Sequence, residues 1–263
     1  MTCIFYDNRQ FNKTLIRIKN LYMRYFFTLI LAILCFSSFC QSNWIIDNKT
    51  GCKIQDIFQR KFEKYSWSGG CIDSIANGQG TLIWRFLGFT RDKYIGNLKN
   101  GIPTGQGKFI YSKNLIYSGE FKNGKLNGPG IKISGKHRYE GEFIDDELNG
   151  LGKLFRDNRL EYEGQFTNSV ENGAGKMYSS DGSIFQGILE NGYYKKGKLT
   201  DVNGDILDGE WDDFELINGT YKYHDGRLYE GQMKDWRPNG LGKMIYSDGT
   251  IENGIWKKGK LIK

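Results

Sequence analysis

The stretch that decides the fold reads YSGEFKNGKLNGPG from Tyr117 and recurs with few changes as YEGEFIDDELNGLGKLF from Tyr139. In the first copy Tyr117, Gly119 and Phe121 alternate with polar residues, which is the period-two pattern of a half-buried strand. The motif N-G-x-x-x-G follows, and its Asn and Gly are turn formers that tolerate positive φ. Each copy is therefore predicted to be a β-hairpin.

The same unit recurs along most of the chain at steps of 22 or 23 residues. Its common form is Y-x-G-x-F-x-x-G-x-x-x-G-x-G-K-x-x-Y, and an earlier unit begins at Gly69. Because a lone hairpin is marginal in water, successive hairpins are expected to stack and share an aromatic face. The first glycines of the regular units are Gly96, Gly119, Gly141, Gly164, Gly187, Gly209, Gly231 and Gly254.

These glycines and aromatic residues resemble the MORN repeat family, and the resemblance covers about residues 69–263. The sequence departs from the family pattern at Asp146, Ser169 and Leu207. It departs again after Gly197, where the G-x-G pair is lost. The fifth and sixth repeats are therefore predicted to be irregular or kinked.

The predicted fold class is all-β: an elongated, single-layer antiparallel β-meander, or solenoid-like array, of stacked β-hairpin repeats. About nine MORN-type repeats are expected in residues 67–263, after an irregular N-terminal segment at 41–66. With two strands at about 4.8 Å each, every repeat advances roughly 10 Å, so the regular repeats would span on the order of 80 Å.

An apolar leader precedes the repeats and predicts export. Residues 25–39 read YFFTLILAILCFSSF, which is too short for a typical membrane-spanning helix and is preceded by Arg24. We predict a signal peptide at residues 1–40, with Met23 as an alternative start, and a periplasmic, cell-surface or secreted protein. The alternatives are a chain anchored in the membrane by residues 25–40 and a lipidated Cys40.

Two cysteines, Cys52 and Cys71, remain beyond the predicted leader. An even pair in an exported chain indicates a disulfide, which would contribute roughly 3 kcal/mol in the chain-entropy model. The alternative is two unpaired thiols. These cysteines and the distant His137 and His224 supply too few ligands for a metal site, so no metal is predicted.

The formal charge of +7 is concentrated in the leader. Residues 1–40 hold five of the 37 basic residues and one of the 30 acidic ones, so the rest of the chain carries only +3. Nucleic-acid binding needs clustered basic residues, and we therefore predict no nucleic-acid partner.

No catalytic pattern stands out, and the chain is predicted not to be an enzyme or to need a cofactor. Three G-x-x-x-x-G-K stretches, starting at Gly119, Gly192 and Gly254, imitate a phosphate-binding loop. Each is followed by Leu where that loop requires Ser or Thr, and each falls at one phase of a hairpin repeat. They are interpreted as parts of the repeat.

The function predicted is a binding or scaffolding surface for unknown protein partners outside the cytoplasm. The alternatives are peripheral association with membrane phospholipid, which the family name suggests, and self-association through the strand near 251–262. Aromatic residues make good contacts at interfaces, although the same rings could form the core. The candidate contact face consists of Tyr117, Phe121, Tyr139, Phe143, Tyr162 and Phe166.

Overall fold

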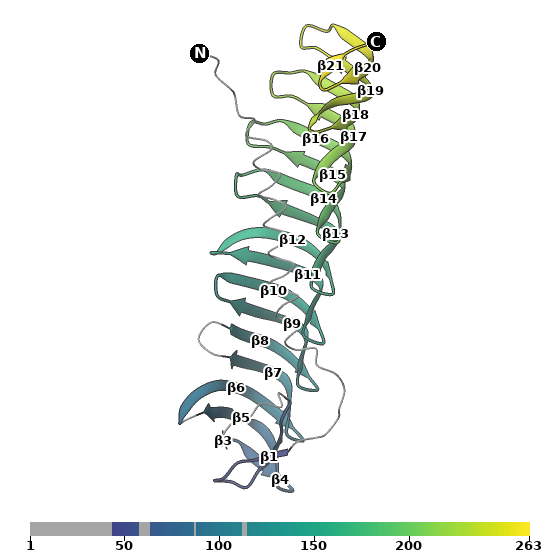
Figure 1. Ribbon diagram of the computed structural model, residues 1–263. Helices are drawn as coiled ribbons and strands as arrows, with labels where there is room; N and C mark the ends of the chain where they lie inside the picture. Colours follow the sequence, from purple (N-terminus) through teal and green to yellow (C-terminus); the bar gives the residue numbers. More distant parts are fainter. Residues whose placement is uncertain (1–43, 58–63, 87, 112–114) are drawn as a thin grey trace. The chain divides into compact units, whose positions relative to one another are not determined.

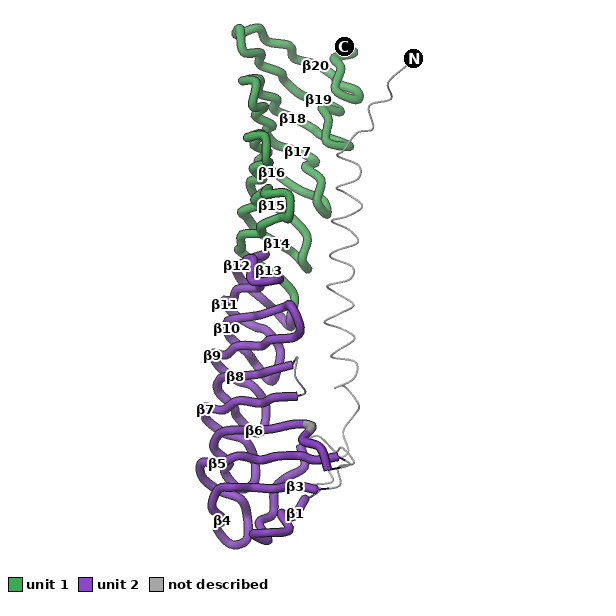
Figure 2. Tube along the Cα trace, turned by 90° about the vertical axis from the view of Figure 1, so that its left-hand side faces the viewer, with its two compact units in different colours: residues 1–37, 170–263 green, residues 38–169 purple. Residues whose placement is uncertain are grey.

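The computed structural model describes residues 44–57, 64–86, 88–111 and 115–263. The chain divides into two compact units, which Figure 2 shows in different colours. We call the described residues up to Ser169 the N-terminal unit and Val170–Lys263 the C-terminal unit. The predicted signal peptide at 1–40 lies outside the described residues.

Every regular element among the described residues is a β-strand, and Figure 1 shows the strands following one another in chain order within each unit. The N-terminal unit contains β1 (Trp44–Ile46), β2 (Lys53–Gln55), β3 (Lys64–Trp67), β4 (Gly70–Ile72), β5 (Ile75–Phe86), β6 (Phe89–Lys99), β7 (Ile102–Tyr111), β8 (Leu115–Lys122), β9 (Lys125–Ser134), β10 (His137–Ile144), β11 (Glu147–Arg156) and β12 (Arg159–Thr167).

The C-terminal unit continues the same arrangement. It contains β13 (Val170–Tyr178), β14 (Ile184–Glu190), β15 (Tyr193–Thr200), β16 (Ile206–Asp212), β17 (Glu215–Lys222), β18 (Leu228–Lys234), β19 (Arg237–Ile245), β20 (Ile251–Lys257) and β21 (Lys260–Leu261). Within each unit, from β5 to β12 and from β13 to β21, consecutive strands pair antiparallel. The predicted all-β array of hairpin repeats is confirmed.

A row of glycines crosses the middle of each unit, and we call it the glycine row. On neighbouring strands these glycines lie directly opposite one another, as Gly107 does to both Gly96 and Gly119. The row is Gly80, Gly96, Gly107, Gly119, Gly130, Gly141, Gly152 and Gly164 in the N-terminal unit, and Gly175, Gly187, Gly197, Gly209, Gly219, Gly231, Gly242 and Gly254 in the C-terminal unit.

At several positions of the row, a tyrosine ring occupies the space that the missing glycine side chains leave. A Cβ added to Gly107 would lie 2.7 Å from the Tyr94 hydroxyl oxygen, which is closer than real side-chain contacts allow. The Tyr94 hydroxyl donates a hydrogen bond to the Asn97 carbonyl at 3.0 Å, and burial raises the pKa of Tyr94 to about 12. Tyr139, Tyr162 and Tyr229 donate equivalent bonds at 2.8–3.0 Å. The buried ring thus keeps its polar atom satisfied.

The turns between strands have the positive φ angles that Asn and Gly tolerate. Asn123 and Gly124 connect β8 to β9 with φ values of 52° and 83°, as a two-residue hairpin turn requires. The Gly124 amide also donates a hydrogen bond to the Pro103 carbonyl of the preceding hairpin at 3.0 Å. Hairpins are therefore joined at their turns as well as along their strands.

A bulge beside the glycine row explains the second glycine of N-G-x-x-x-G, which is Gly150 in the copy that begins at Tyr139. Glu142 pairs with Asn149 while Gly141 pairs with Gly152, so Gly150 and Leu151 are extra residues on β11. Gly150 has a φ of 66°, and a Cβ there would collide with the Glu142 side chain. Glycine is therefore favoured at this position.

The repeats that depart from the pattern have a shorter bulge. Ile188 pairs with Lys196 and Leu189 with Tyr194, which leaves Lys195 as the single extra residue on β15. Ile217 is likewise the single extra residue on β17. Neither residue has a positive φ, so no glycine is needed. The loss of the G-x-G pair therefore marks a bulge that is one residue shorter. The strands of these repeats pair on both sides of the bulge, in place of the irregular or kinked hairpins that were predicted.

The segment 41–66, predicted to be irregular, contains β1, β2 and most of β3. β2 pairs antiparallel with β1 and parallel with β5, where Lys53 lies opposite Ile75. Cys52, Ile54 and Ala76 are buried here. The segment therefore covers one end of the first hairpins, and its strands are too short to produce a recognisable period in the sequence.

We expect Gly107→Ala to destabilise the protein by roughly 1–3 kcal/mol, because the new methyl group displaces the Tyr94 ring from the glycine row. The midpoint of urea denaturation would measure this loss. Lys108→Ala is the matched control, since the neighbouring Lys108 side chain is exposed. Equal midpoints for the two variants would contradict the role given to the glycine row.

Candidate functional site

The six aromatic residues named as a candidate contact face lie in the core of the N-terminal unit. None of them is more than 8% exposed. The Tyr139 ring packs edge-on against Phe143 and Phe166, with ring centroids 5.2 and 5.1 Å apart, and Tyr162 packs in the same way against Phe166. As folded, the rings stabilise the hairpin stack and leave binding to other surfaces.

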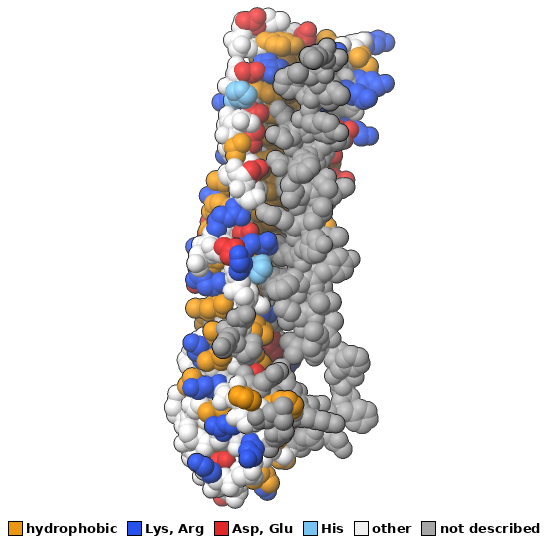
Figure 3. All heavy atoms as spheres, turned by 60° about the vertical axis from the view of Figure 1, so that its left-hand side comes forward, with side chains coloured by type: hydrophobic (Ala, Val, Ile, Leu, Met, Phe, Trp, Pro, Cys, Tyr) orange, Lys and Arg blue, Asp and Glu red, His pale blue; other side chains and the backbone are white. Residues whose placement is uncertain are grey.

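The opposite side of the strands, which we call the outward face, carries charges that compensate one another. Lys153 stands directly between Glu140 and Glu163 on the neighbouring strands, and its ammonium lies 3.2 Å from the Glu163 carboxylate. Lys243 lies 3.8 Å from Glu230 in the same arrangement. On the side of the molecule that Figure 3 shows, basic and acidic side chains of the described residues are interspersed. At these positions the charges of the outward face compensate one another.

Large aliphatic side chains are exposed between these charges. Leu241 and Ile255 lie directly opposite each other on β19 and β20 and are 66% and 41% exposed. Leu151 occupies the equivalent bulge position in the N-terminal unit and is 64% exposed. Contiguous exposed apolar side chains surrounded by polar residues mark protein contact surfaces, and the paired Leu241 and Ile255 form such a group.

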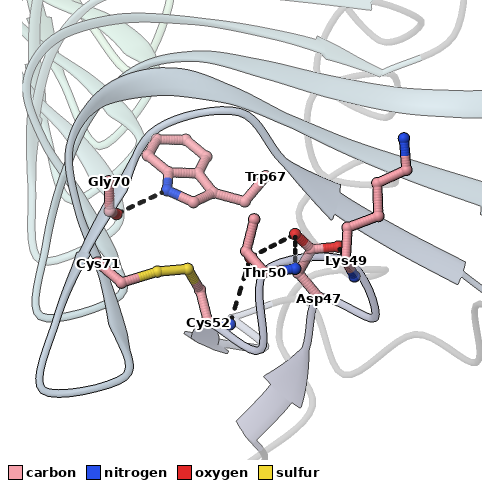
Figure 4. The surroundings of a disulfide bond; sticks show 7 residues. All are labelled: Asp47, Lys49, Thr50, Cys52, Trp67, Gly70 and Cys71. Atoms are coloured by element: carbon pink, nitrogen blue, oxygen red, sulfur yellow. Dashed lines mark hydrogen bonds between the residues drawn. A yellow bond between two sulfur atoms is a disulfide. The ribbon is translucent and has the colours of Figure 1, made fainter.

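The structure joins Cys52 and Cys71 in a disulfide, with their Cα atoms 5.9 Å apart (Figure 4). The bond ties the chain just before β2 to β4. The neighbouring turn is held by Asp47, which accepts a hydrogen bond of 2.5 Å from the Thr50 hydroxyl, while the Cys52 amide donates to the same hydroxyl oxygen at 3.3 Å. The Trp67 indole donates to the Gly70 carbonyl at 3.0 Å beside the disulfide.

A buried carboxylate in the C-terminal unit orients the exposed His224. Asp205 is 2% exposed and accepts a hydrogen bond of 2.6 Å from the Tyr221 hydroxyl. It also accepts one of 2.7 Å from the His224 amide, and the His224 Nδ1 atom lies 2.7 Å from the same oxygen. Burial acts to raise the pKa of Asp205, but the hydrogen bonds from Tyr221 and His224 outweigh it and hold that pKa below its ordinary value.

This arrangement joins two β-turns rather than supplying a base to a nucleophile. Asp205 ends the turn 201–205, and His224 lies in the next turn, at 223–227. The Tyr221 hydroxyl is committed to Asp205 and is not placed as a nucleophile. Sequence reasoning missed the group because its members lie 16 and 19 residues apart. The sequence offered one signal for this group. Asp205 is acidic, whereas the equivalent turns have Ser183, Arg227 and Thr250 at the same position.

A buried lysine stands in the aromatic core of the N-terminal unit. Lys132 lies opposite both Tyr117 and Tyr139, and its ammonium is 5.2 Å from the centre of the Tyr117 ring. Burial lowers the pKa of Lys132, and the nearby Asp146 carboxylate opposes that shift. Phe109 and Leu154 occupy the equivalent position on β7 and β11. The sequence pattern did not predict that Lys132 is buried.

Two further searches cover only the described part of the chain. Among these residues, no group of three or more His, Cys, Asp or Glu side chains could hold a metal ion. The same ranges contain no helix that is long and apolar enough to span a membrane.

Comparison with known families agrees with the hairpin geometry. A family model described as the MORN repeat matches residues 94–115, 117–136, 139–158, 162–184 and 229–251. The unmatched interval between the last two segments contains the hairpins with the shortened bulge. No curated protein matches the chain.

The chain is therefore a tandem array of β-hairpin repeats whose glycines and tyrosines recur in register. It is a MORN repeat protein, with five such repeats between residues 94 and 251. Repeats of this family generally serve as binding or scaffolding modules, often in association with membranes, and their all-β fold is generally not catalytic.

We expect Asp205→Asn to destabilise the protein by about 1–3 kcal/mol near pH 7, because a buried charged hydrogen-bond acceptor is lost. A carboxyl group with a depressed pKa stabilises the fold above its unfolded value of 3.8, and this contribution disappears as the pH falls through the folded pKa. Denaturation midpoints should therefore differ near pH 7 and converge below pH 3.8. A difference that is independent of pH would contradict the assigned role.

Proposed function

We propose that this protein is a non-catalytic scaffold that binds protein partners outside the cytoplasm. The observation that carries the proposal is the outward face, where exposed aliphatic side chains such as Leu151 and Leu241 stand among mutually compensated charges. Such a surface suits protein contacts, in which apolar area and polar complementarity act together. The same compensation weakens attraction to nucleic acid, because phosphate binding depends on uncompensated cations.

Location outside the cytoplasm is supported by two independent features. The apolar run at residues 25–39 has the length and flanking residues of a signal peptide. Cys52 and Cys71 are paired, and structural disulfides persist mainly in oxidising compartments. Periplasmic, cell-surface and secreted destinations are all compatible with these features.

The second candidate function is peripheral association with anionic membrane lipid. It is favoured by the basic turn between β20 and β21, where Lys257, Lys258 and Lys260 are all exposed. A lysine near an anionic surface contributes about 1 kcal/mol, so this turn gives a modest attraction. The protein scaffold remains the first proposal because the outward face is far larger than one turn.

The binding surface can be tested by placing a photo-crosslinking amino acid in the native host at Leu241, and in a second variant at Leu151, both on the outward face. We expect discrete protein adducts at these positions and none at Phe185, which is fully buried and serves as the control. The same probe at Lys257 examines the second candidate, because adducts of lipid mass there would favour membrane association. If Leu241 and Leu151 give no protein adduct, the scaffold proposal fails.

Export predicts the intact mass of the protein purified from its native host. The measured mass should be that of a chain that begins at Gln41. Cys52 and Cys71 should react with an alkylating reagent only after reduction, because the disulfide protects both thiols. Retention of residues 25–40 together with free labelling of both thiols would show an anchored protein facing the cytoplasm. That result would contradict the proposed location.

A further inference from the structure

Residues 44–57 cross the first hairpin turns of the N-terminal unit, and we call this segment the strap. The Lys53 amide donates a hydrogen bond of 2.7 Å to the Ser74 carbonyl in the turn between β4 and β5. Two residues later, the Gln55 amide donates one of 3.1 Å to the Gly101 carbonyl in the turn between β6 and β7. The strap therefore runs from one repeat to the next along the edge that these turns form.

The strap packs closely against this edge. Ile54 is buried, and a Cβ added to Gly101 would lie 3.3 Å from the Ile54 Cα atom and 3.0 Å from the Trp44 ring. A Cβ on Gly124, in the turn between β8 and β9, would lie 3.3 Å from the Ile57 side chain. The strap thus contacts three successive turns of the edge.

The strand pairing that attaches the strap to the sheet is short. β2 has three residues, and its register with β5 consists of the single pair Lys53 and Ile75. The antiparallel partner of β2 is β1, which belongs to the strap itself. The disulfide between Cys52 and Cys71, by contrast, joins the strap covalently to β4. Because this cross-link limits the chain entropy that release would gain, we expect it to be the main restraint on the strap.

The two cysteines of this disulfide differ in their access to solvent. Cys52 is 0% exposed, whereas Cys71 is an exposed residue of β4. An external thiol can therefore approach the disulfide from the side of Cys71 and not from the side of Cys52. Exposed disulfides undergo thiol exchange more readily than buried structural ones.

We propose that the disulfide is a redox latch, which a dithiol reductant opens to release the strap from the turns. A thiolate of the reductant attacks the Cys71 sulfur and forms a mixed disulfide, and Cys52 leaves as a thiolate that takes up a proton. The second thiol of the reductant then forms a disulfide within the reductant and frees Cys71 as a thiol. Two electrons pass from the reductant to the protein, and no other co-reactant is needed.

Opening the latch changes what this edge offers to a partner. Once the strap leaves, the Ser74 and Gly101 carbonyls lose the amides that donate to them. Backbone acceptors along an edge are groups to which an extended peptide can bind. The disulfide forms in an oxidising compartment, so the latch in the cell rests on the proposed location. Purified oxidised protein tests the latch independently of that location.

Release of the strap can be measured by hydrogen–deuterium exchange of the full chain in a mild non-ionic detergent. On reduction, the Lys53 and Gln55 amides should exchange at least roughly tenfold faster, because loss of the cross-link favours local opening. The Gly192 amide, which donates to the Glu171 carbonyl in the C-terminal unit, is the control and should keep its rate. Unchanged rates at Lys53 and Gln55, or an equal acceleration at Gly192, would overturn the latch.

A double variant with Cys52→Ser and Cys71→Ser separates the latch from other effects of the reductant. Its two strap amides should exchange as fast as those of the reduced protein, whether or not reductant is present. The matched control carries Cys3→Ser and Cys35→Ser, which change the predicted leader alone, and it should respond to reduction as the unchanged protein does. A double variant whose strap exchanges as slowly as in the oxidised protein would contradict the latch.

Glutathione tests the order of attack, because a monothiol leaves a mixed disulfide that can be trapped. The oxidised protein is exposed briefly to reduced glutathione, quenched with an alkylating reagent and analysed by peptide mass spectrometry. Glutathione on Cys71 with the alkyl group on Cys52 should exceed the reverse pattern at least roughly tenfold, because only Cys71 is exposed. Equal amounts of the two patterns, or glutathione mainly on Cys52, would overturn the proposed route of opening.

Discussion

The structure depends on the contact between buried aromatic rings and glycines that face one another on adjacent strands. Gly96 and Gly107 leave a space that the Tyr94 ring fills, and its hydroxyl reaches a backbone carbonyl three residues along the same chain. The ring can reach this position only because both glycines lack a Cβ. The glycine row therefore sets the strand register, and the strand register sets the repeat length of 22 or 23 residues.

This packing decides which surfaces remain for function. Because the rings are buried in the core, a partner contacts the outward face of the strands or the turns along their edges. The turn backbones are held by hydrogen bonds to the preceding hairpin, as at Gly124 and Gly259.

Much of the hairpin architecture could be predicted because its signals are local. The alternation at Tyr117 and Phe121 predicts a strand with one buried side, and Asn123 with Gly124 predicts the turn that ends it. The candidate site was harder to predict from the sequence. Whether an aromatic residue lies in the core or on a contact surface depends on what covers it, and a strand pattern shows only that one side differs from the other.

The sequence by itself determined the all-β class, the repeat spacing and the hairpin turns, because these follow from contacts within one repeat or between neighbours. Only the tertiary structure decided that the six candidate contact rings are buried, and that Asp205 meets Tyr221 and His224. These features join residues from different hairpins, and their proximity depends on strand register and on bulge length, which residue periodicity does not encode.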